Sequence, residues 1–244
     1  MDHDLKLQQR VLDRFELVSG IGEPDEGTAC VMSLAAHLAG EGRTDRPRCA
    51  SPLIRDLVIP VNDGMPREAR RRLKPFVPRL IGTNDGLDRA RAEVLRKVLA
   101  EVILPRASSE RQAPSPGGPA PRLAGLFGHL RIRLLRGALL RHVGRLLAEA
   151  EAGRGRGLET ELASAAGHLL SSCARDAPDP REAEWYWNQA IGLLDRLCEA
   201  GAHEERGAAV GVRAGGATAR GELLDALSGT GESGGGPPRP SSGG

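Results

Sequence analysis

Aromatic residues and long apolar runs are both scarce in this chain of 244 residues. It contains three Phe, two Trp and one Tyr, so a core of adequate size must be built from Leu, Val, Ile and Ala. Even 123–147, the stretch richest in Leu, is interrupted by five arginines. A membrane-spanning helix needs about 18 or more apolar residues in succession. We therefore expect no membrane segment.

Signals for export and several catalytic motifs are also missing. Asp2 and Asp4 are acidic where a signal peptide is basic, and no apolar segment follows them. No Walker loop, His-Glu-x-x-His or Cys-x-x-Cys pattern occurs. We expect a cytoplasmic protein that holds no cofactor.

Cysteine is too sparse to define a scaffold. Cys30, Cys49, Cys173 and Cys198 are spaced too widely for a zinc ribbon and are too few for a disulfide framework. We expect four free thiols in a reducing compartment.

Lysine is almost absent, because Lys6, Lys74 and Lys97 are the three lysines among 34 basic residues. Together with abundant Ala and Gly, this indicates the codon usage of a GC-rich bacterial genome. The high arginine content is therefore no evidence for phosphate binding. The net charge of +2 favours no particular partner either.

Charge is distributed unevenly along the second half of the chain. Basic residues outnumber acidic ones in 107–157, and the reverse holds in 158–205. Two interpretations stay open. The basic part, 122–145, either packs on the acidic segment as a complementary helix or binds an external anion such as nucleic acid or an anionic surface.

Apolar residues recur at helical spacing through much of the first 106 residues. The pattern predicts helices over 4–18, 26–39 and 87–104, the last ended by Pro105. Shorter helices are expected where proline suits a first turn. These begin at Ser51-Pro52 (closed by Pro60), at Pro66 and at Pro75. We predict one compact helical domain over 1–106.

The remainder alternates between low-complexity and helical stretches. Residues 107–121 are rich in Ser, Pro and Gly and are predicted to be a linker without core residues. A second helical unit is predicted over 122–205, and a disordered tail over 206–244. Its helices are expected over 122–152, 158–173 and 181–200. The predicted fold class is all-α, with a helical domain, a linker, a second small helical unit and a disordered C-terminal tail.

The apolar residues of 122–152 do not share one helix face. At about 100° per residue, Leu126, Leu130 and Leu134 lie on one side, whereas Leu135 lies on the other, and the change falls near Gly137. Either the helix breaks there or it is buried on both sides. A helix lying on a membrane surface is disfavoured, because it needs one continuous apolar face.

The sharpest candidate for chemistry is the set Cys30, His37 and Glu41, which line up on one side of the predicted helix 26–39. A thiol with an imidazole and a carboxylate suits an activated nucleophile. With Cys49 the set has the ligand types that zinc prefers. However, seven residues of helix span about 10 Å, so Cys30 and His37 would need a third element between them. The alternative is a core cysteine and a boundary histidine.

The densest basic cluster is Arg70-Arg71-Arg72 with Lys74. On a helix it would form a positive face that could contact nucleic acid. No aromatic residue interleaves for base stacking, so a solvated surface is the competing interpretation.

Half of the aromatic residues are adjacent, in Trp185-Tyr186-Trp187. Helical spacing predicts Tyr186 and Trp187 in the core and places Trp185 on the other side, with Arg196. Exposed tryptophan is typical of protein-binding surfaces. We predict that Trp185 and Arg196 contact a partner.

Several short segments resemble uncharacterised, Ala-rich helical proteins of high-GC bacteria. The resemblance extends over about the first hundred residues and the last helix, and implies a bacterial source but no activity. The segments are Ala29-Cys30-Val31-Met32-Ser33-Leu34, Thr44-Asp45-Arg46-Pro47, Val61-Asn62-Asp63, Arg72-Leu73-Lys74-Pro75-Phe76 and Ile191-Gly192-Leu193-Leu194-Asp195-Arg196-Leu197.

The function that these patterns favour is a non-enzymatic helical interaction or adaptor module with a protein partner. One alternative is a Cys/His-dependent enzyme or metal-binding protein centred on Cys30 and His37. A second is a nucleic-acid-binding protein that uses the Arg70–Lys74 cluster.

Overall fold

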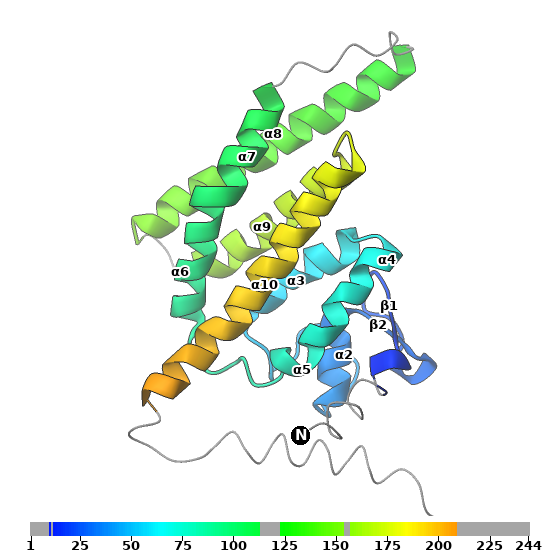
Figure 1. Ribbon diagram of the computed structural model, residues 1–244, viewed down its shortest axis with the longest axis vertical. Coiled ribbons are helices and arrows are strands. Elements are labelled where there is room, and N and C mark those ends of the chain that lie inside the picture. The colour runs from blue at the N-terminus through cyan, green and yellow to red at the C-terminus, as the bar shows by residue number, and fades with distance from the viewer. Residues whose placement is uncertain (1–9, 11, 113–122, 154–156, 209–244) are drawn as a thin grey trace, which may run out of the picture.

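The computed structural model describes residues 10, 12–112, 123–153 and 157–208, and the side chains of 110–133 and 201–208 lie outside this description. The described chain is all-α apart from two short strands, as the sequence predicted (Figure 1). The helices and strands in chain order are β1 (Glu16–Leu17), η1 (Pro24–Glu26), β2 (Thr28–Ala29), α2 (Val31–Leu38), α3 (Pro52–Gly64), α4 (Arg67–Arg70), η2 (Arg71–Phe76), α5 (Val77–Leu80), α6 (Asp88–Val98), η3 (Leu99–Ile103), α7 (Leu104–Gln112), α8 (Leu123–Glu151), α9 (Leu158–Arg175) and α10 (Pro180–Ala208).

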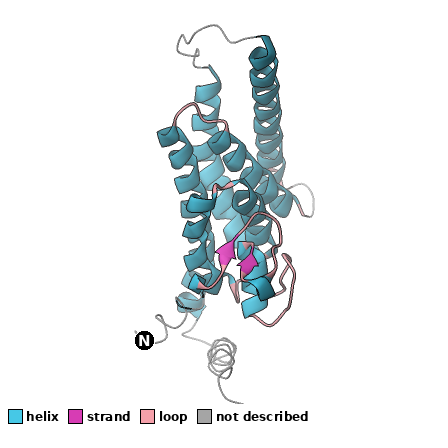
Figure 2. Cartoon of the chain, turned by 90° about the vertical axis from the view of Figure 1, so that its right-hand side faces the viewer, coloured by secondary structure: helices cyan, strands magenta, loops and turns pink. Residues whose placement is uncertain are grey.

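The two strands replace parts of two predicted helices. β1 and β2 pair in parallel at one end of the bundle (Figure 2). The predicted helix 4–18 is therefore wrong at its C-terminal end, and residues 4–9 and 11 lie outside the described chain. Between the strands, Gly22 has φ +71°, and a Cβ there would lie 2.6 Å from the Cα of Ala29, so this close approach requires glycine.

A buried asparagine holds this N-terminal segment on the bundle. Asn62 of α3 donates its side-chain N–H to the carbonyl of Val18 at 2.8 Å and accepts from the backbone N–H of Val31 at 3.3 Å. Val31 is the first residue of α2, which starts later than the predicted residue 26. Long-range bonds of this kind override local helix propensity.

Two prolines that were predicted to end helices lie inside them. α3 continues through Pro60 to Gly64. The Ser171 hydroxyl of α9 donates a hydrogen bond to the Pro60 carbonyl at 2.8 Å. Likewise, α6 passes through the π-helical turn η3 into α7, which contains Pro105. A wider π turn just before proline is the expected accommodation, because proline offers no N–H and its ring crowds the preceding turn.

The core joins the two halves of the chain. Buried side chains from Leu12 to Ala107 and from Leu140 to Cys198 form one continuous hydrophobic cluster. Ala107 is completely buried, which corrects the prediction that 107–121 contributes no core residue. Residues 113–122 of that predicted linker lie outside the described chain.

The closest helix pair in the core is α3 with α9, which lie side by side near the centre of Figure 1. Gly167 faces the backbone of Leu57, and a Cβ there would lie 2.4 Å from the Leu57 carbonyl oxygen. Gly64 similarly faces Ser171. Small residues at these points allow the two backbones to approach.

α8 is a single uninterrupted helix, so the predicted break near Gly137 is wrong. The alternative, burial on both sides, does not hold at Leu134 and Leu135, which are exposed, and the side chains of 123–133 lie outside the description. Its C-terminal half packs into the core through four apolar residues. Its N-terminal end extends beyond the rest of the bundle (Figure 1). The four residues are Leu140, Val143, Leu146 and Leu147.

α10 runs to Ala208 and so includes the first three residues of the predicted tail, of which 209–244 lie outside the described chain. Within the part that the structure describes, no helix combines the length and apolar character that crossing a membrane requires.

Candidate functional site

Cys30 is the N-cap of α2 rather than a residue within it. Its Sγ accepts the backbone N–H of Ser33 at 3.2 Å, and the Ser33 hydroxyl accepts the backbone N–H of Cys30 at 3.0 Å. Burial raises the pKa of the Cys30 thiol, against the effect of its hydrogen bonds with Ser33. A buried thiol with a raised pKa is a poor nucleophile at neutral pH.

His37 and Glu41 do not complete a triad with Cys30. The His37 ring packs edge-on against Phe15, with 5.6 Å between ring centroids. Glu41 lies beyond the end of α2, where its carboxylate accepts the backbone N–H groups of Arg48 at 2.5 Å and Cys49 at 2.7 Å. It thereby closes the loop that precedes α3.

These contacts also determine how Glu41 and Cys49 ionise. Burial acts to raise the pKa of Glu41, but the hydrogen bonds from Arg48 and Cys49 outweigh it and lower that pKa. Burial and the adjacent Glu41 raise the pKa of Cys49 to about 12. Among the described residues, no group of three or more His, Cys, Asp and Glu side chains is placed to hold a metal ion.

The predicted basic cluster is divided between the interior and the surface. Arg70 is buried and donates to three backbone carbonyls, those of Met65 at 2.7 Å, Asn62 at 2.8 Å and Leu17 at 3.2 Å. Arg70 therefore joins β1 to the end of α3. It is not part of a solvated basic face.

The neighbouring arginines bind the acidic helix α10. Arg72 pairs with Glu184 at 2.6 Å and also donates to Asn188, and Arg79 pairs with Asp195 at 2.6 Å. The acidic segment 158–205 thus finds cationic partners in the first half of the chain. α8 also packs on α9, where His142 and Glu161 approach to 3.9 Å.

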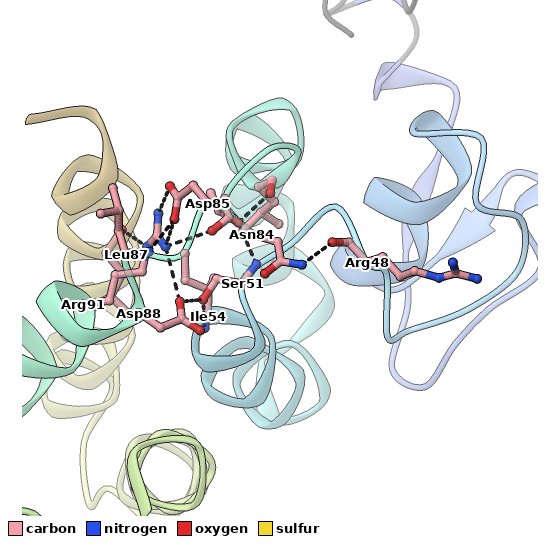
Figure 3. Close-up of polar contacts among 11 residues, drawn as sticks. Arg48, Ser51, Ile54, Asn84, Asp85, Leu87, Asp88 and Arg91 are labelled. Carbon is pink, nitrogen blue, oxygen red and sulfur yellow. Dashed lines mark hydrogen bonds and ion pairs between the residues drawn. The ribbon is translucent and has the colours of Figure 1, made fainter. Parts of the chain in front are cut away.

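The most extensive polar network is one that sequence reasoning missed. The Arg91 side chain is completely buried and makes ion pairs with Asp85 at 2.6 Å and Asp88 at 3.3 Å (Figure 3). It also donates to the carbonyls of Thr83 at 2.8 Å and Leu197 at 3.1 Å. No pattern in the sequence indicated that Arg91 is buried.

Ser51, the N-cap of α3, belongs to the same network. Its hydroxyl accepts the backbone N–H of Ile54 at 3.2 Å and donates to Asp88 at 2.5 Å. Burial acts to raise the pKa of Asp85, but hydrogen bonds from Arg91 and Leu87 outweigh it and lower that pKa. The network joins α3, α6 and α10, so its role is structural.

Trp185 and Arg196, the predicted partner contacts, differ in exposure. Trp185 is partly buried, with the Arg106 guanidinium 5.2 Å from its ring centroid and the Tyr186 ring at 4.9 Å. Arg196 is exposed. Tyr186 and Trp187 are buried, as the helical spacing predicted.

A second apolar surface appears on α8, at Leu134 and Leu135. These leucines are 63% and 61% exposed and are the large hydrophobic residues of the described chain that lie open to solvent. The following residue, Arg136, donates to the Tyr186 hydroxyl at 3.3 Å. The leucine pair therefore adjoins the contact between α8 and α10.

No protein-family model, curated protein or solved structure matches this chain. The resemblance to Ala-rich helical proteins of high-GC bacteria stays a prediction, and the site must be interpreted from its own geometry.

Proposed function

We propose that this protein is a non-enzymatic helical interaction module that binds an acidic, leucine-bearing helical segment of another protein. The binding surface is centred on Leu134 and Leu135 of α8. The exposure of these two adjacent leucines is the observation that carries the proposal.

Adjacent helix residues point about 100° apart, so exposure of both leucines means that no described residue covers a wide sector of α8 at this point. Fully burying a leucine side chain contributes about 1.5–3 kcal/mol. A partner that covers both leucines would gain a substantial part of that energy. A helix laid against this sector is a recurring mode of such recognition.

The charge around the leucines selects the kind of partner. From 111 to 148 the sequence contains arginine and histidine but no Asp or Glu. A second copy of α8 would bring arginines against arginines, which is unfavourable. An acidic segment would instead find complementary charge, which raises the association rate and orients the complex.

The surface adjoins Tyr186, whose ring contacts Trp185, the aromatic residue that was predicted to bind a partner. Arg136 contacts Tyr186 on α10, and Arg106 of α7 covers the ring of Trp185. A helix bound at Leu134 and Leu135 would therefore lie where α7, α8 and α10 meet. Trp185 remains a proposed contact at the edge of this surface, and Arg196, about 16 Å further along α10, remains a proposed contact on its own.

The two alternative functions have less support. An enzyme centred on Cys30 and His37 would need a reactive thiol, yet Cys30 caps a helix and its thiol pKa is raised. A nucleic-acid site at Arg70–Lys74 would need solvated cations, yet Arg70 binds backbone carbonyls and Arg72 pairs with Glu184. A cytoplasmic location is part of the proposal and can be checked by cell fractionation.

The test uses the full chain with a photo-crosslinking amino acid at position 134, irradiated in its native lysate. We expect a cross-link to another protein, and mass spectrometry should map it to a segment that combines acidic residues with leucine. A matched control carries the photo-crosslinker at Arg89, a residue of α6 whose side chain is 92% exposed.

Substitution provides a second arm. L134S/L135S should abolish binding of the partner that the cross-link identifies, whereas Arg89→Ser should leave this binding intact. Raising the salt concentration should weaken the binding. Cross-links to a second copy, to nucleic acid or to a segment without acidic residues would each overturn the proposal. Equal cross-linking from position 89 would do the same.

A further inference from the structure

α3 and α9 border a surface pocket that none of the features above uses. Its volume is about 380 Å³, within the range of small-molecule sites. Charged and polar side chains dominate its lining. They include Arg46, Asp56, Asp63, Ser164, His168 and Arg175.

The close packing of the two helices forms the base of this pocket. Gly167 of α9 lies against Leu57 and Pro60 of α3, and Gly64 of α3 lies against Ser171 of α9. The two helices therefore run parallel to each other. The Ser171 hydroxyl bonds the Pro60 carbonyl at 2.8 Å between these points. The base is therefore built from backbone that is fixed at several points, which makes the pocket a preorganised one.

Its walls carry opposite charges. Asp56 and Asp63 come from α3, whereas His168 and Arg175 come from α9, and Arg46 comes from the loop before α3. Within the described chain, no ion pair within 4.0 Å joins one wall to the other. The acidic and basic groups therefore face a common space without neutralising each other directly.

Both walls retain bonding capacity. Asp63 uses Oδ1 for the backbone N–H of Gly20 at 2.8 Å, so its second carboxylate oxygen is left for a donor, whereas Asp56 already forms an ion pair with Arg55 at 2.8 Å. Arg175 donates through Nε to the carbonyl of Ser171 at 3.4 Å, and the two terminal nitrogens of its guanidinium remain for an acceptor. An arginine fork with two such donors suits a carboxylate.

We infer that this pocket binds a small zwitterion of the α-amino-acid class. The ligand carboxylate accepts from Arg175, and its ammonium donates to Asp63, which lies beside Gly64 at the same end of the pocket. A simple oxyanion would meet two carboxylates, and a simple cation would meet two arginines, so either would lose part of its attraction. A molecule with both charges satisfies both walls, and Ser164 and His168 offer further polar contacts to its side chain.

The test is a titration of the ¹⁵N-labelled full-length protein with pools of the twenty common L-amino acids, followed by NMR. We expect at least one amino acid to shift the amide signals of Gly64 and Ser171 in a saturable manner. Its N-acetyl and carboxamide derivatives, which each lack one charge, should bind at least tenfold more weakly.

Matched variants locate the binding. Asp63→Asn keeps an acceptor for Gly20, and Arg175→Gln removes the guanidinium, and each should weaken binding at least tenfold. Arg48→Gln and Arg181→Gln, which remove exposed arginines outside the pocket, should not weaken binding. Asp63→Ser, which also removes the carboxylate, replaces Asp63→Asn if that variant does not fold. Failure of all twenty amino acids to shift these signals overturns the inference, as does equal binding of the N-acetyl derivative or indifference to Asp63→Asn and Arg175→Gln.

Discussion

Two regions of this molecule contain similar side chains, which are buried or paired in one region and exposed to solvent in the other. In the bundle of α3, α6, α9 and α10, Arg91 is buried and ion-paired, Asp195 of α10 pairs with Arg79, and leucines form a continuous core. In the N-terminal half of α8, Leu134 and Leu135 are exposed in a stretch without acidic residues. The comparison shows that composition does not decide the role of an arginine or leucine here. The availability of a second element beside it does.

Loss of Arg91 should cause the largest change on the bundle side of this comparison. In Arg91→Met the carboxylates of Asp85 and Asp88 and the carbonyls of Thr83 and Leu197 lose their donor, so the free energy of unfolding should fall by about 3–5 kcal/mol. Urea denaturation measures this. Arg89→Met, on an exposed side chain of the same helix, should change stability by less than about 0.5 kcal/mol. Similar small effects for both variants would contradict a structural role for the network.

Two positions of α8 test the contrast within a single helix. Leu146 is buried, and Leu146→Ala should cost about 2–5 kcal/mol through lost contacts and a cavity. Leu134→Ala should change the free energy of unfolding by less than about 0.5 kcal/mol, because no packing is lost. Thermal and urea unfolding of the two variants give the comparison directly. A large loss from Leu134→Ala would mean that this leucine is covered within the protein itself.

Glycine substitutions extend the comparison to the backbone. Gly167→Ala would place a Cβ 2.4 Å from the Leu57 carbonyl oxygen and should cost about 1–3 kcal/mol as the helices separate. Gly144 of α8 has nothing within 4 Å of the same position, so Gly144→Ala should be neutral or should stabilise by up to about 1 kcal/mol. Circular dichroism melts should therefore show a lower melting temperature for Gly167→Ala and an unchanged or higher one for Gly144→Ala.

Acid should weaken the bundle through Asp85. Its pKa is lower in the folded state than in the unfolded state, so its stabilising contribution is complete above the usual aspartate value of about 4. This contribution is lost as the pH falls through the lower, folded-state pKa. The free energy of unfolding, measured from pH 5 to pH 3, should decline more steeply for the natural chain than for Asp85→Asn. Parallel pH profiles would remove Asp85 as the cause.

The smallest expected effect concerns Cys30, a buried residue that resembled a catalytic one in the sequence. Cys30→Ser keeps an N-cap acceptor and should change stability by less than about 1 kcal/mol, whereas Cys30→Ala loses the cap and should cost about 1 kcal/mol. The native thiol should react slowly with a thiol reagent at pH 7, because burial raises its pKa. Rapid modification of Cys30 would revive the enzymatic alternative.

Much of the helical structure could be predicted from local patterns. Ser51 caps α3, as the sequence indicated, and Asp179 accepts the N–H groups of Arg181 and Glu182 at the start of α10. The missed features depend on partners far along the chain. Glu16–Leu17 forms a strand because Thr28–Ala29 lies beside it, and α3 continues past Pro60 in contact with Ser171 of α9.

The candidate site was less predictable than the fold for the same reason. Cys30, His37 and Glu41 share a face only if one helix contains all three, and α2 contains only His37 of the set. Arg70 looked like part of a basic surface, but its donors reach backbone carbonyls that no sequence pattern marks. Leu134 and Leu135 are exposed because no described residue packs over this part of α8, and the local sequence does not indicate that either.

The sequence alone determined the all-α class, the main helices and several of their caps, because spacing and capping act within one or two turns of the chain. Only the tertiary structure decided which arginines are structural, which leucines are exposed and where α3 and α9 leave a charged pocket. These properties depend on contacts between elements that are often more than a hundred residues apart, as Arg91 with Leu197 and Arg79 with Asp195 show. The residues next to a side chain in the sequence do not indicate which distant partner it contacts in the folded protein. The role of that side chain is therefore decided by tertiary packing.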